Sequence, residues 1–90
     1  MDSGADVAAA AAVLSSLFNK IFPVDTVCFG EVGLTGEIRP VQRGEERLRE
    51  AAKLGFKQAL VPKGNKISRK IPDIEIISLL RVEDLVAWLE

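Results

Sequence analysis

Two short runs of mainly apolar residues, 59–61 and 74–79, limit what this chain can fold into more than any other feature. Each run is too short for a stable helix and apolar enough to predict a strand buried inside the protein. Pro62 follows the first run directly and ends it. Segments with helical spacing stand before the first run and after the second. The pattern therefore predicts an α/β (α+β) domain in which helices pack on a mixed sheet.

Helices are predicted at residues 5–19, 44–54 and 82–89. Asp2 or Ser3 can cap the first one, and Pro23 stops it from continuing. The apolar side chains of this helix are predicted to form one stripe that faces the core, made of Val7, Ala11, Leu14 and Phe18 and widened by Val13 and Leu17.

The second and third predicted helices also have an inward face. In the second it consists of Leu48, Ala51 and Ala52, and Gly55 supplies the left-handed residue that ends the helix. In the third it consists of Val82, Leu85, Val86 and Leu89.

Residues 26–41 are predicted to form a β-hairpin. Its strands lie near 26–29 and 37–39, and the turn between them has the sequence Gly-Leu-Thr-Gly at 33–36. Pro40 ends the second strand or confines it to a sheet edge. Gly30 predicts a bulge or a close approach of the backbone to another element.

The composition excludes several kinds of site. A chain of 90 residues forms one small domain, and it contains one cysteine, Cys28, and no histidine. Cys28 cannot form an internal disulfide and is interpreted as a small buried hydrophobe. Zinc-finger, Ser-His-Asp and Cys-His chemistry are excluded without histidine. No apolar run reaches the roughly 18–20 residues that cross a bilayer, so no membrane partner is expected.

A net charge of −1 hides a basic block between two acidic ends. Residues 39–70 contain ten lysines and arginines against three glutamates, and the flanking segments are both acidic. Such a block can contact nucleic-acid phosphates without regard to base sequence. The candidate DNA-binding residues are Arg39, Arg43, Lys63, Lys66, Arg69 and Lys70. The alternative is that residues 63–70 form a solvated loop and that the arginines only balance neighbouring glutamates.

Three sequence blocks carry a resemblance to a known family. They are Phe-Gly-Glu-Val-Gly-Leu-Thr-Gly-Glu-Ile-Arg-Pro-Val at 29–41, Glu-Arg-Leu-Arg-Glu-Ala-Ala-Lys-Leu-Gly-Phe at 46–56 and Leu-Val-Pro-Lys at 60–63. In this order and spacing they resemble the carboxy-terminal domain of the RadA (Sms) family. That domain is similar to the proteolytic domain of Lon, whose fold is of the ribosomal-protein-S5-domain-2-like type.

The resemblance implies a role in DNA recombination and repair. RadA-family members combine a zinc finger, a RecA-like ATPase and a Lon-like domain, and they form hexameric rings on branched DNA. Residues 1–90 lack the zinc finger and the phosphate-binding Gly-Lys-Ser/Thr loop, so the chain is expected to be a partial Lon-like domain, an excised fragment or the product of a truncated gene. ATP, magnesium and zinc are then expected only in the longer family members. The implied location is the bacterial cytoplasm, with the plant chloroplast or mitochondrion as the alternative.

The resemblance also allows a test for peptidase activity. Lon proteases use a serine nucleophile and a lysine base, and the alignment places Gly4 and Glu45 at those positions. We therefore predict a non-catalytic domain that acts as an assembly scaffold and contacts DNA. A Ser-Lys peptidase of the Lon type is the disfavoured alternative, and a free-standing interaction module is the third.

Overall fold

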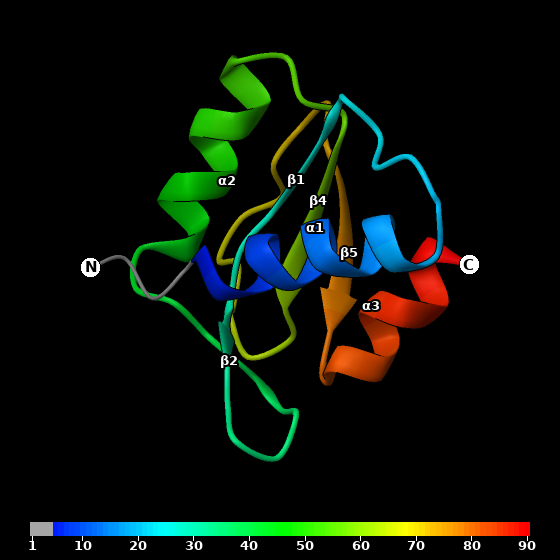
Figure 1. The fold of residues 1–90 in the computed structure, drawn as a ribbon. Helices are drawn as coiled ribbons and strands as arrows, with labels where there is room; N and C mark the ends of the chain where they lie inside the picture. Colours follow the sequence, from blue (N-terminus) through cyan, green and yellow to red (C-terminus); the bar gives the residue numbers. More distant parts are fainter. Residues whose placement is uncertain (1–4) are drawn as a thin grey trace.

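The computed structural model describes residues 5–90, so the predicted helix caps Asp2 and Ser3 lie outside it. Figure 1 shows the fold, whose elements in chain order are α1 (Asp6–Leu17), β1 (Thr26–Cys28), β2 (Glu31–Val32), β3 (Ile38–Arg39), α2 (Gly44–Lys53), β4 (Gln58–Pro62), β5 (Glu75–Leu79) and α3 (Val82–Leu89). The three predicted helices and the two predicted buried strands are all present within a few residues of the expected bounds.

The main sheet consists of three parallel strands. β4 is the central strand and pairs with β1 on one side and with β5 on the other. β2 and β3 form a separate antiparallel pair. The prediction of one mixed sheet is therefore wrong in detail, because the antiparallel pair does not join the parallel strands.

The predicted hairpin is confirmed only in part. The short strands β2 and β3 pair across the turn at 33–36, but Thr26–Cys28 pairs with Gln58–Leu60 instead. The reason is burial on both faces of β1, since Val27 packs against one hydrophobic core and Cys28 against the other. A strand covered on both faces is typical of a parallel sheet rather than of a two-stranded hairpin.

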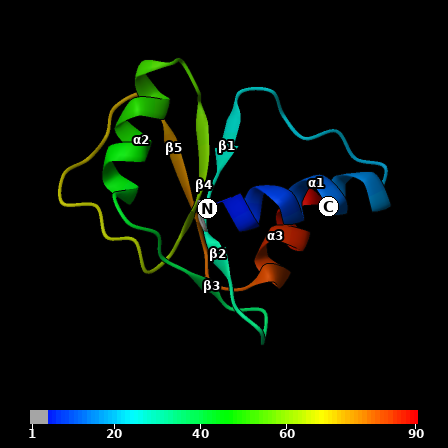
Figure 2. The ribbon, with the colours of Figure 1, turned by 60° about the vertical axis from the view of Figure 1, so that its left-hand side comes forward.

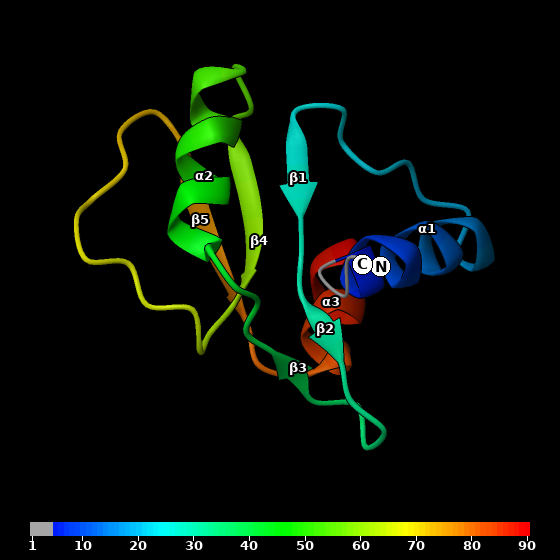
Figure 3. The same ribbon diagram turned by 90° about the vertical axis from the view of Figure 1, so that its left-hand side faces the viewer.

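Helices cover both faces of the sheet (Figures 2 and 3). α2 lies on one face, where Leu48 packs with the core that contains Ala59 and Val61. α1 and α3 lie on the other face, where Leu60 contacts the second core. Successive residues of β4 thus enter opposite cores, as the alternation of side chains along a strand requires.

Gly30 lies where the chain leaves the parallel sheet and enters the hairpin. Its backbone has a φ of +149°, and a Cβ atom there would lie 2.7 Å from Cγ2 of Val7. The absence of a side chain lets the Val7 N–H donate a 3.1 Å hydrogen bond to the Gly30 carbonyl. The predicted close backbone approach is therefore present, and it holds the start of α1 beside the end of β1.

α1 buries a narrower stripe than predicted. Val7 and Ala11 are buried and Leu14 is partly buried, but Phe18, just beyond the end of α1, is exposed, and Val13 and Leu17 within the helix are 58% and 73% exposed. At roughly 100° per residue, Val13 lies about 100° and Leu17 about 60° from Leu14, which forms the nearer edge of this stripe. Their predicted inward orientation is wrong because α1 contacts the rest of the domain along one line only. No helix within residues 5–90 has the length and apolar character needed to cross a membrane.

Leu60→Ala is predicted to lower the free energy of unfolding by about 2–5 kcal/mol, because it removes a fully buried side chain from the central strand. Leu34→Ala is the matched control. It makes the same substitution at a fully exposed turn residue and should change stability by less than about 0.5 kcal/mol. Urea denaturation followed by Trp88 fluorescence measures both, and equal losses would contradict the assigned core.

Candidate nucleic-acid interface

The candidate site is the basic loop, residues 63–70, at the start of the connection between β4 and β5. The connection contains no helix and runs on the α2 side of the sheet (Figures 2 and 3). Lys63, Lys66, Arg69 and Lys70 all have exposed side chains. The structure therefore brings these four candidate DNA-binding residues together on one segment of chain.

The first anchor of the basic loop is Asn65. Its side-chain amide donates a 2.8 Å hydrogen bond to the Val41 carbonyl, and its side-chain oxygen accepts a 3.0 Å hydrogen bond from the Val41 N–H. A Cβ atom at Gly44 would lie 2.4 Å from this amide nitrogen. Asn65 thus pairs with both the N–H and the carbonyl of Val41, as a residue of a neighbouring strand would. Its side chain fits there because residue 44, at the start of α2, is a glycine.

The second anchor is an interaction between Ser68 and Glu45. Glu45 accepts hydrogen bonds from the Ser68 N–H at 2.7 Å and from the Ser68 hydroxyl at 2.9 Å. Arg49, one turn further along α2, forms an ion pair with the same carboxylate at 3.0 Å. The backbone N–H of Ser68, then Arg49 and the Ser68 hydroxyl, lower the pKa of Glu45 to about 2. Glu45 is therefore ionised at neutral pH and hydrogen-bonded to the basic loop.

Apolar contacts complete the attachment. Ile67 packs against the core under α2, and Ile71, just beyond the loop, is buried there. The side chains of residues 65, 67, 68 and 71 thus turn toward the protein. The basic side chains between them are left facing solvent.

Arg39 and Arg43, the two candidate arginines outside the basic loop, differ from the loop cations in their electrostatic surroundings. Arg39 forms ion pairs with Glu31 at 3.6 Å and Glu37 at 3.2 Å, and Arg43 forms one with Glu46 at 2.9 Å. Across residues 5–90, no ion pair involves any of the four loop cations. The prediction that some arginines balance neighbouring glutamates is confirmed for these two. Lys63 contributes to the lowered pKa of Asp84, and the other three loop cations form no ion pair within the described residues.

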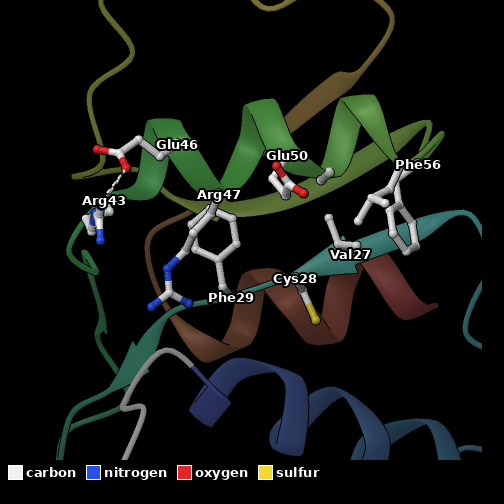
Figure 4. Close-up of a pocket in the computed structure, with 10 residues that line it drawn as sticks. Val27, Cys28, Phe29, Arg43, Glu46, Arg47, Glu50 and Phe56 are labelled. Atoms are coloured by element: carbon white, nitrogen blue, oxygen red, sulfur yellow. Dashed lines mark hydrogen bonds and ion pairs between the residues drawn. The ribbon is translucent and has the colours of Figure 1, made fainter.

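A second feature near the basic block is an open groove of about 650 Å³ between α2 and β1 (Figure 4). Val27, Phe29 and Phe56 line it, and Arg47 lies 5.8 Å from the centre of the Phe29 ring. Cys28 points away from α2 in this view, and burial raises the pKa of its thiol to about 11. The cysteine is therefore an uncharged thiol at neutral pH, consistent with its interpretation as a small hydrophobe.

Three further features bear on possible sites: Trp88, Gly4 and the arrangement of acidic side chains. Trp88 is partly buried and its ring lies 5.5 Å from that of Phe22, measured between ring centres. Gly4, at the position of the Lon nucleophile, lies outside the described residues. In the part of the chain that the structure describes, no group of three or more cysteine, aspartate and glutamate side chains is arranged to hold a metal ion.

Sequence reasoning did not identify the residues that anchor the loop. The sequence is consistent with a loop at residues 63–70, but nothing local predicts that Asn65 binds the backbone of a residue 24 positions earlier. Glu45 stands at the position of the Lon lysine, but nothing in the sequence indicates its partner Ser68, which lies 23 positions later. Both contacts depend on the tertiary fold.

Comparisons with known proteins connect the chain to two groups. Residues 2–65 match the family described as subunit ChlI of Mg-chelatase. The chain is 46% identical over 89 residues to the DNA repair protein RadA of Haemophilus influenzae, covering 99% of this chain and 19% of that protein. It is 48% identical over 83 residues to DNA repair protein RadA of Pseudomonas aeruginosa, covering 92% of this chain and 18% of that protein. The chain is 45% identical over 87 residues to DNA repair protein RadA of Escherichia coli, covering 96% of this chain and 19% of that protein. The chain spans less than a fifth of the length of these relatives.

Acidification is predicted to destabilise the fold through Glu45 and Glu37. The pKa of Glu37 is lowered to about 2 by its own backbone N–H and by the hydroxyl and N–H of Thr35. Both carboxylates have folded-state pKa values below the ordinary 4.5. Their contribution is therefore complete above pH 4.5 and disappears as the pH falls through about 2. Urea denaturation between pH 2 and 6 measures this change, and Glu45→Gln should flatten it. A variant with an unchanged pH profile would show that the Glu45 contacts do not form.

Proposed function

We propose that this chain, which belongs to the family described as subunit ChlI of Mg-chelatase, is a non-catalytic Lon-like domain that contacts DNA and assembles with copies of itself. The proposal starts from its homology to the carboxy-terminal region of bacterial RadA. The fold is proposed to be of the ribosomal-protein-S5-domain-2-like type. We further propose that ATP, magnesium and zinc bind outside residues 1–90 in the longer family members, and that the chain acts in the bacterial cytoplasm.

The observation that carries the DNA-contact proposal is the basic loop. Its four cations are exposed, belong to no ion pair within residues 5–90 and lie on a segment anchored by Asn65 and Ser68. Cations held in this way bind the phosphates of a nucleic acid through charge alone. No aromatic side chain stands between them, so the proposed contact is with the sugar-phosphate backbone and not with stacked bases.

The proposal of a non-catalytic domain is supported by Glu45. A Lon-type peptidase needs an amine there to take the proton of the serine hydroxyl, whereas this chain has an ionised carboxylate already engaged by Ser68 and Arg49. The Ser-Lys peptidase remains the disfavoured alternative.

The assembly proposal is supported by an apolar ridge formed by α1 and the residues that follow it. Val13, Leu17, Ile21 and Val24 are exposed, the last two to 92% and 94%. Lys20 is the one charged residue between Val7 and Val24, so two such surfaces bring few like charges together. A second copy of the chain is the proposed partner. A module that stays monomeric and binds another protein is the alternative function that the same ridge would serve.

The DNA proposal predicts that Lys63→Glu/Lys66→Glu/Lys70→Glu weakens binding to a labelled forked DNA by at least about tenfold near 0.1 M salt. The slope of log affinity against log salt should also become shallower, by roughly 0.9 for each phosphate that the variant no longer neutralises. Fluorescence anisotropy across a salt series measures both quantities.

The matched control is Lys20→Glu/Lys53→Glu/Lys57→Glu. It makes the same change in net charge with three exposed lysines outside the loop. Equal weakening by the two triple variants would mean that net charge, and not the basic loop, governs binding. A wild-type chain that fails to bind even at low salt would rule out the DNA-contact proposal.

The assembly proposal predicts that the wild-type chain shows a mass above its 9.8 kDa in light scattering, increasing with concentration. Leu17→Asp/Ile21→Asp places two charges in the ridge and should return the mass to that of a monomer. Leu34→Asp, which charges an exposed leucine in the hairpin turn, should leave the association unchanged. A wild-type chain that is monomeric at every concentration would favour the alternative module.

A further inference from the structure

The attachment of the basic loop depends on one carboxylate. Glu45 accepts hydrogen bonds from both the N–H and the hydroxyl of Ser68, which lies between Lys66 and Arg69 in the sequence. Its side chain is 26% exposed, and Arg49 fixes its orientation from the next turn of α2. Asn65 anchors the loop three residues earlier, but no other polar side chain of the described residues holds the stretch 66–70.

Glu45 has two opposing effects on the binding of a phosphate ligand. Its negative charge lies beside the cations and opposes the approach of DNA. Its hydrogen bonds restrict the loop, so that the cations need not be ordered when DNA binds. Arg49 partly compensates the charge by its 3.0 Å ion pair, whereas no other residue replaces the hydrogen bonds. The restriction should therefore have the larger effect.

The geometry points to Glu45 as the positioning residue of the basic loop, which holds Lys66, Arg69 and Lys70 in place for simultaneous contact with phosphates. This inference rests on the proposed DNA contact. It assigns to the position of the Lon base a role that involves no proton transfer, because the carboxylate acts through Ser68 and does not itself touch the ligand.

The first experiment measures the loop without DNA. Trypsin cleaves after Lys66, Arg69 and Lys70, and mass spectrometry gives the rate at each bond in the 90-residue chain. Glu45→Ala should raise these rates by about tenfold or more, since proteolysis follows the population of the opened loop. Glu50→Ala is the matched control. It removes the same charge from an exposed position of α2, its side chain has no hydrogen bond or ion pair within residues 5–90, and it should leave the rates unchanged.

The second experiment measures DNA affinity by fluorescence anisotropy on the same variants. Glu45→Ala should bind about three- to tenfold more weakly than Glu50→Ala, although each variant lacks one negative charge. Glu45→Gln keeps one acceptor oxygen and should fall between the wild type and Glu45→Ala. Ser68→Ala changes no charge, removes the hydrogen bond that the hydroxyl donates to the Glu45 carboxylate and should act in the same direction, which keeps the test open if Glu45→Ala fails to fold.

The outcomes separate this inference from the proposed function. Faster cleavage and weaker binding in Glu45→Ala and Ser68→Ala, relative to Glu50→Ala, support it. Unchanged cleavage, or faster cleavage with the affinity of the control, overturns it while leaving the DNA contact intact. Absence of binding by the wild-type chain removes the proposed function and this inference together.

Discussion

Burial of β4 on both faces is the constraint on which the rest of the structure depends. Leu60 enters the core beneath α1 and α3, while Ala59 and Val61 enter the core beneath α2. β4 also has a parallel neighbour on each side, and parallel strands need crossover connections, so the chain has to cross the domain before β4 and again after it. α2 makes the first crossing. The second has no helix, and its irregular backbone carries the basic loop.

Elements defined by local patterns could be predicted from the sequence. The bounds of α3 follow from the spacing of Val82, Leu85 and Leu89, and the turn at 33–36 follows from its glycines. The partner of β1 could not be predicted, because pairing with β4 joins residues about thirty positions apart and a nearer hairpin partner fits the same propensities. The width of the buried face of α1 was also beyond reach, since so many alanines fit either side of a helix.

The candidate site shows the same limit in electrostatic terms. The basic block, residues 39–70, is evident in the sequence from its net charge of +7, but composition alone could not show which of its cations form ion pairs. Arg39 and Arg43 are held by neighbouring glutamates, whereas Lys66 and Arg69 are not. The loop that carries Lys66 and Arg69 is anchored by Glu45 and Asn65, single polar side chains that give no periodic signal. Polar contacts between distant segments are therefore the part of this site that a sequence pattern misses.

The anchors of the basic loop also have a consequence for how this chain can vary in length. Asn65, Ser68 and Ile71 are attached at intervals of three residues, so each attachment fixes the count of residues to the next. Surface loops ordinarily accept insertions at small cost. An added residue between Asn65 and Ser68 would break one attachment or move Lys66 out of register. The basic loop is therefore a segment of fixed length.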